Sequence, residues 1–100
     1  MVKVGLLATI KAKPGKEAAV TELLSGAVAL ANQEAKTVVW FSFRIDDSSF
    51  GVFDAFADES GRKAHLEGEI AKALMAKAEE LLAEPPSIKP VDLLGVKLSA

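Results

Sequence analysis

The strand-forming segments of this sequence are apolar on both sides, and this feature constrains the fold most. Residues 37–45 and 50–57 consist almost entirely of strand-favouring residues, and Asp46-Asp47-Ser48-Ser49 separates them as a hairpin turn. Alternate residues of a strand point to opposite faces. In the first segment, one face carries Val38, Trp40, Ser42 and Arg44, and the other carries Val39, Phe41, Phe43 and Ile45. A sheet with one wetted face would alternate with polar residues, so we expect both faces to be covered.

The rest of the chain predicts a helix and a strand on either side of this hairpin. Residues 3–12 predict a strand that stops at Lys13-Pro14-Gly15, because proline lacks the ladder donor. A helix is expected from Pro14 to about Glu34, because its apolar residues follow three-four spacing. Gly26 interrupts that helix at a cost of roughly 1 kcal/mol, so we expect it to mark close packing.

The second half repeats the pattern. Asp58 is expected to cap a short helix that runs to His65 or Leu66, and Gly68 to break or bend it. A further helical segment, 69–83, ends at Glu84-Pro85-Pro86-Ser87, and residues 88–98 predict a last strand with an edge proline. The order β-α-β-β-α-β defines the α+β, ferredoxin-like class: one domain, residues 1–100, with a four-stranded antiparallel sheet and helices on one face.

Two helices cover only one face of such a sheet, so the other needs a partner. Burying ~800 Å² on each partner would contribute about 20 kcal/mol per partner before association costs. We therefore expect a homodimer with the sheets facing each other and a cavity between sheet and helices or between sheets. A monomer with an unusually hydrophobic surface is the alternative.

Composition narrows the function classes without choosing among them. Twelve basic and fourteen acidic residues leave a net charge of −2, which gives no electrostatic footprint for nucleic acid or an anionic membrane. The chain has no cysteine and a single histidine, which exclude thiolate chemistry and a multi-histidine metal site. Without a signal-peptide pattern or a membrane-length apolar run, a cytoplasmic location is expected.

Two groups of residues are candidates for chemistry. His65 has the one side chain that ordinarily titrates near neutrality, and Asp54 lies among apolar residues of a strand; together they would form a carboxylate-oriented general base. Alternatively, Asp54 caps a loop or meets Arg44, and His65 is half exposed.

Trp40, Ser42 and Arg44 share a strand face and could bind an aromatic, anionic ligand. Alternatively, Trp40 is a core anchor and Arg44 forms an ion pair at the rim. Phe41 and Phe43 could line the cavity instead.

Three motifs resemble the antibiotic biosynthesis monooxygenase family of the dimeric α/β-barrel superfamily. They are Lys13-Pro14-Gly15-Lys16 after the first strand, the run 53–59 (Phe-Asp-Ala-Phe-Ala-Asp-Glu), and Ala64-His65-Leu66. The resemblance covers nearly the whole chain and implies a dimeric α/β barrel, each subunit holding a pocket. It equates His65 with the family histidine and Asp54 with the strand carboxylate, followed by the strand aromatic Phe56. Glu67-Gly68-Glu69-Ile70 lacks the second histidine of many members.

The resemblance implies a monooxygenase that oxidises a small aromatic, phenol or quinol with molecular oxygen, using neither metal nor flavin. His65 and Asp54 would be catalytic. Trp40, Ser42, Arg44 and Phe56 are expected to contact the substrate; Trp40 and Arg44 match no family motif and are included for their chemistry alone. No cofactor, nucleic acid or membrane is expected, and the partners are the substrate, oxygen and a second copy. The alternatives are a non-catalytic, stress-response-type ligand-binding barrel and a lactone isomerase-like enzyme.

Overall fold

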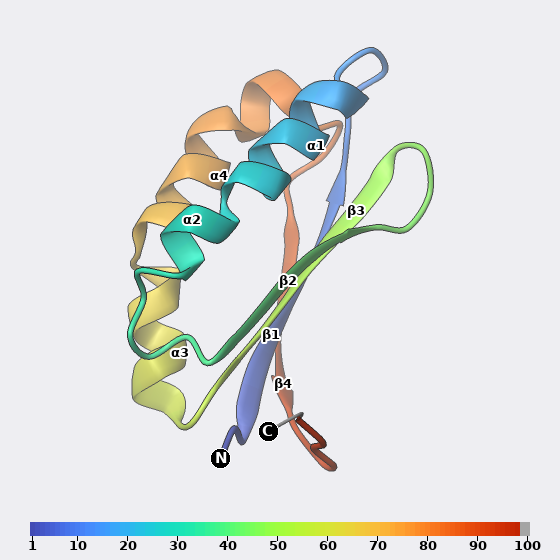
Figure 1. Cartoon of the computed structure of the whole chain (residues 1–100). Helices are drawn as coiled ribbons and strands as arrows, with labels where there is room; N and C mark the ends of the chain where they lie inside the picture. The colour runs from blue at the N-terminus through green and yellow to red at the C-terminus, as the bar shows by residue number, and fades with distance from the viewer. Residues whose placement is uncertain (99–100) are drawn as a thin grey trace.

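Four antiparallel strands form a sheet whose one face is covered by helices, as the computed structural model of residues 1–98 shows (Figure 1). The elements in chain order are β1 (Val4–Lys11), α1 (Glu17–Gly26), α2 (Val28–Ala31), β2 (Val39–Arg44), β3 (Ser49–Phe56), α3 (Glu59–Leu66), α4 (Glu69–Leu81) and β4 (Ser87–Asp92). This confirms the predicted ferredoxin-like fold with helices on one face.

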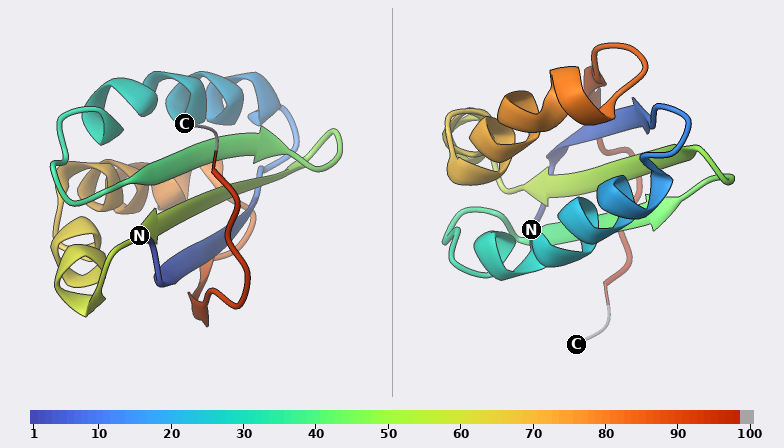
Figure 2. Two further views of the ribbon diagram at one scale, coloured as in Figure 1. Left: turned by 60° about the horizontal axis from the view of Figure 1, so that its bottom comes forward. Right: turned by 90° about the horizontal axis from the view of Figure 1, so that it is seen from above.

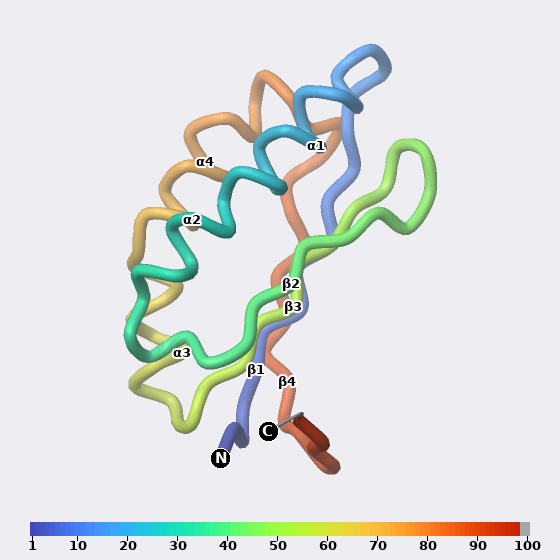
Figure 3. The backbone as a smooth tube through the Cα atoms, viewed as in Figure 1, coloured from blue at the N-terminus to red at the C-terminus, as the bar shows by residue number. Residues whose placement is uncertain are grey.

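The sheet order is β2-β3-β1-β4, so the first strand lies inside the sheet and the last at its edge. β1 pairs antiparallel with both β3 and β4. Pro90, opposite Leu6, therefore occupies an edge strand, where a missing backbone donor is tolerated. The backbone trace shows β2 and β3 crossing in front of β1 and β4, with all the helices to one side (Figure 3).

The long helix expected before β2 is divided. α1 ends at Gly26, and the short α2 begins at Val28. The prediction that Gly26 marks close packing is wrong, since a Cβ there would meet nothing within 4 Å. Glycine's poor helix propensity accounts for the end of α1 at this residue.

The last predicted strand is also shorter than expected. β4 stops at Asp92, and Leu93 makes one further backbone hydrogen bond, to the carbonyl of Lys3 at 3.0 Å. Asp92 pairs with Val4, the first residue of β1, so no strand remains for residues 93–98 to pair with. These residues cross the sheet on the side away from the helices (Figure 2), beside Phe41 and Phe53.

The two faces of the sheet differ in what covers them. Ala8, Ile10, Phe50 and Val52 point toward the helices and are buried against α1 and α4. The opposite side, called here the open face, carries a group of apolar residues that no helix covers: Leu7, Val39, Phe41, Phe43 and Phe53. Phe41 is 58% exposed and Phe43 38%. Apolar residues thus occupy both faces, as the sequence predicts.

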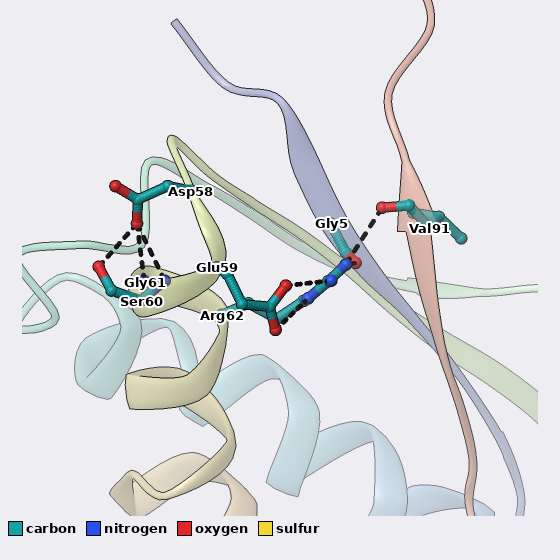
Figure 4. A network of polar contacts seen from close by, with 7 residues as sticks. All are labelled: Gly5, Asp58, Glu59, Ser60, Gly61, Arg62 and Val91. Atoms are coloured by element: carbon teal, nitrogen blue, oxygen red, sulfur yellow. Dashed lines mark hydrogen bonds and ion pairs between the residues drawn. The ribbon is translucent and has the colours of Figure 1, made fainter.

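Polar contacts fix α3 at its N-cap and along its first half (Figure 4). The carboxylate of Asp58 accepts hydrogen bonds from the backbone N–H groups of Ser60 and Gly61, which confirms the predicted N-cap. Arg62 donates to the carbonyls of Gly5 at 3.2 Å and Val91 at 3.3 Å, and pairs with Glu59. These bonds attach α3 to β1 and β4 and set the position of the helix turn that follows.

No helix within residues 1–98 has the length and apolarity to cross a bilayer.

Candidate functional site

The sole histidine lies between two carboxylates beneath the helices. His65 Nε2 is 3.0 Å from Asp54 Oδ2, and Nδ1 is 2.6 Å from Glu34 Oε1. Asp54 is 2% exposed and His65 7%. The structure therefore brings together the two residues singled out from the sequence and adds Glu34, which the sequence analysis missed.

Three separate elements supply this cluster, which we call the carboxylate–imidazole cluster (Glu34, Asp54, His65). Asp54 is on β3 with its side chain toward the helices, and His65 is in the last turn of α3. Glu34 follows α2 in a turn, where its Oε1 also accepts a hydrogen bond from the Thr37 hydroxyl at 2.6 Å. The ring of Phe56 packs against His65 with the centroids 5.5 Å apart. Packing and hydrogen bonding together fix the imidazole.

The cluster holds a positive charge on the imidazole at neutral pH. Burial opposes that charge, but the hydrogen bonds and negative charges of Asp54 and Glu34 outweigh burial and raise the pKa of His65 from 6.5 to about 9. Both ring nitrogens then donate to carboxylates, so neither is free to accept a proton. In the resting cluster, Asp54 carries a fully buried acceptor atom, Oδ1, that has no hydrogen-bond partner.

Asp54 and His65 form the polar end of a cavity between the sheet and the helices. The other lining residues are all apolar: Leu6, Ala8, Leu23, Leu24, Ala27, Val52, Leu66, Ile70, Ala71, Ala73, Leu74 and Ile88. The volume of the cavity is ≈ 60 Å³. An apolar pocket with few converging polar groups is the usual form of a small-molecule site. The pocket thus lies on the helix-facing side, which the sequence left open.

The other residues expected to contact a substrate lie on the same sheet face but do not line this cavity. The Ser42 hydroxyl donates to the Leu24 carbonyl at 3.1 Å, and Arg44 Nη2 donates to Thr21 Oγ1 at 2.8 Å. Ser42 and Arg44 line a separate open pocket. Arg44 lies over the Phe50 ring and does not meet Asp54.

Trp40 and Phe56 belong to the packing around the cavity. Trp40 is partly buried against the core, with its indole Nε1 buried and unpaired. Phe56 is fully buried behind His65. Among residues 1–98, no group of three or more acidic, histidine or cysteine side chains is arranged to hold a metal ion.

The fold and the site define an α+β, ferredoxin-like protein with a buried acid–imidazole group at one end of an apolar cavity. Solved structures share this fold. A protein of unknown function from Nitrosomonas europaea is 54% identical, with a TM-score of 0.97, and the match covers 100% of this chain and 97% of that one. The chain belongs to the family of that protein.

The wider comparison concerns the fold. A Caulobacter crescentus protein provisionally named an antibiotic biosynthesis monooxygenase is 23% identical with a TM-score of 0.79, over 94% of this chain and 92% of that one. Another structure named an antibiotic biosynthesis monooxygenase is 17% identical with a TM-score of 0.79, over 92% and 99%. The predicted resemblance to this family is therefore confirmed at the level of the fold. No family model and no curated protein matches the chain.

Proposed function

We propose that the chain binds a small phenol or quinol in the helix-side cavity and oxidises it with molecular oxygen, without metal or flavin. The proposal depends on the environment of Asp54, which lines the apolar cavity. His65 pairs with one oxygen of the Asp54 carboxylate, and the other oxygen is buried without a hydrogen-bond partner. The fold shared with structures named antibiotic biosynthesis monooxygenases supports it.

In this proposal Asp54 and His65 have different roles. Asp54 accepts the hydroxyl proton of the substrate, which leaves an electron-rich phenolate that donates electrons to oxygen. One oxygen atom enters the ring to give a quinone, and the other leaves as water with the two hydrogens lost by the substrate. His65 is the positioning residue: held by Glu34, it fixes Asp54 and offsets the negative charge of the carboxylates.

Oxygen consumption with a panel of phenols and hydroquinones tests the reaction. We expect uptake by the wild type and a loss on the order of 100-fold or more in Asp54→Asn, because general-base catalysis contributes about that much. Asp47→Asn, an exposed aspartate in the β2–β3 turn, is the matched control and keeps full activity. Turnover that survives both Asp54→Asn and His65→Ala unchanged would remove the cluster from the mechanism.

A non-catalytic ligand-binding barrel is the second candidate, favoured by the fact that both nitrogens of His65 are already paired. It predicts that phenols raise the melting temperature while no compound of the panel causes oxygen uptake. A lactone isomerase-like enzyme would likewise consume no oxygen but would convert an unsaturated lactone, which absorbance spectroscopy detects.

We also propose that two copies pack through the open face. Phe41 and Phe43 are exposed there beside partly buried Val39 and Phe53, and contiguous apolar patches of this kind mark interfaces. Sedimentation should show a dimer for the wild type and a monomer for Phe41→Asp. Val28→Asp, at an exposed position on α2, is the control and should stay dimeric; a monomeric wild type would refute the interface.

A further inference from the structure

Two buried side-chain atoms within residues 1–98 have no hydrogen-bond partner: Trp40 Nε1 and Asp54 Oδ1. Their residues lie directly opposite each other in the antiparallel register of β2 and β3. Directly opposite residues point to the same side of a sheet, and here that side faces the helices. The unpaired atoms thus come from one cross-strand pair, in which Asp54 lines the cavity and Trp40 lies next to Asp54 in the sheet.

The two atoms are chemically complementary. An indole nitrogen only donates, and an ionised carboxylate only accepts. Buried polar groups in folded proteins are almost always paired, yet these two make no hydrogen bond to each other. A group that accepts from the indole and donates to the carboxylate would satisfy both atoms. A hydroxyl has one donor and two acceptor lone pairs and meets that requirement.

We propose that Trp40 Nε1 and Asp54 Oδ1 form a binding site for a single ligand hydroxyl, which makes Trp40 a specificity-determining residue. This inference rests on the proposed function and adds the chemical group that the site recognises. The indole donates to the hydroxyl oxygen while Asp54 accepts its proton. The ring of the ligand then lies against the apolar wall that contains Leu24 and Val52, which also lines the cavity with Asp54.

The arrangement selects among ligands by charge and by hydrogen-bonding capacity. A ligand carboxylate would meet the Asp54 carboxylate and be repelled, and it has no proton to donate. A ligand ammonium would satisfy Asp54 but leave the indole N–H unpaired. Neutral phenols and enols satisfy both atoms. After proton transfer to Asp54, the indole N–H remains on the same oxygen and stabilises the phenolate.

The wild-type protein offers a direct test, because Trp40 is its only tryptophan and gives a single indole N–H resonance in a ¹H–¹⁵N spectrum. The probes are 4-methylphenol and 1,4-dimethylbenzene, which differ in one hydroxyl. We expect 4-methylphenol to shift this resonance downfield and 1,4-dimethylbenzene to leave it without a downfield shift. Equal shifts with the two probes would overturn the proposal.

Affinity measurements under anaerobic conditions provide the second readout. Trp40→Phe keeps an aromatic ring and removes the N–H, so 4-methylphenol should bind roughly three- to tenfold more weakly, as expected for one hydrogen bond. Asp54→Asn should weaken it too, Asp47→Asn should not, and 1,4-dimethylbenzene should bind all variants alike. If a structural water bridges the two atoms instead, the variants will affect the binding of both probes equally, and this result would contradict the inference. A wild type that binds no phenol would contradict it as well.

Binding without oxygen separates this inference from the proposed reaction. Selective phenol binding together with no oxygen uptake would refute the monooxygenase and keep the hydroxyl site. Oxygen uptake that is unchanged in Trp40→Phe, with no selective binding, would refute the hydroxyl site and keep the monooxygenase.

Discussion

Replacing His65 with glutamine should remove a large pH-dependent part of the stability of this protein. The folded cluster raises the pKa of His65 from 6.5 to about 9. A pKa that differs by one between the folded and unfolded chain corresponds to about 1.4 kcal/mol, so the cluster contributes up to about 3 kcal/mol to folding. Because the pKa is raised, the folded state binds the proton more tightly than the unfolded chain. The contribution is therefore complete below pH 6.5 and is lost as the pH rises through 9.

The assay is urea unfolding of the wild type and His65→Gln at pH 6 and pH 10. Subtracting the variant removes the shared titration of lysines and the N-terminus. We expect the wild type to lose up to about 3 kcal/mol more than His65→Gln between these values, which is a large part of the roughly 5–15 kcal/mol typical of a domain. Equal losses in the two proteins would refute the assignment of a buried, protonated imidazole.

The contributions of Glu34 and Asp54 can be separated by following the titration of His65 in NMR spectra. Glu34→Gln and Asp54→Asn each remove one negative charge beside the imidazole, so each should lower the pKa of His65. Glu80→Gln, exposed on α4, should leave it unchanged. Since His65 is the only histidine, its ring proton resonance reports this pKa without assignment.

Three further substitutions test the fold around the site by urea unfolding. Gly5→Ala should destabilise the protein by about 1–3 kcal/mol through overpacking, because the new Cβ would lie 2.8 Å from the Asp54 carbonyl oxygen. Gly26→Ala should instead stabilise α1 by up to about 1 kcal/mol, because a Cβ there meets nothing within 4 Å. Equal effects would contradict the packing. Arg62→Met should cost about 1–3 kcal/mol by removing the hydrogen bonds to the part-buried carbonyls of Gly5 and Val91. A neutral result would show that these hydrogen bonds contribute nothing. Asp58→Ala should lower the urea midpoint by removing the cap of α3, and an unchanged midpoint would argue against the cap.

The fold was predictable because its local signals agree. The strand-favouring runs on either side of 46–49 and the cap at Asp58 correspond to β2, β3 and α3. The errors arise where local pattern is not enough. Residues 93–98 look like a strand, but β1 begins at Val4 and offers them no partner. Apolar periodicity extends through Gly26, although the helix ends there.

The site was predictable in part for the same reason. An aspartate among apolar strand residues and a single histidine on the next helix are visible anomalies, and the structure places them in contact. Glu34 carries no such signal: it lies 31 positions before His65 in a turn and resembles any surface glutamate. The face that lines the cavity was also open, because both faces of the strands are apolar.

The position of a bound phenol tests the central claim most directly. A crystal structure of the protein with 4-methylphenol should show the ring in the cavity between the sheet and helices α1 and α4, with its oxygen within hydrogen-bonding distance of Asp54 Oδ1. A ring bound instead on the open face among Phe41 and Phe53, with the helix-side cavity unchanged, would contradict the account.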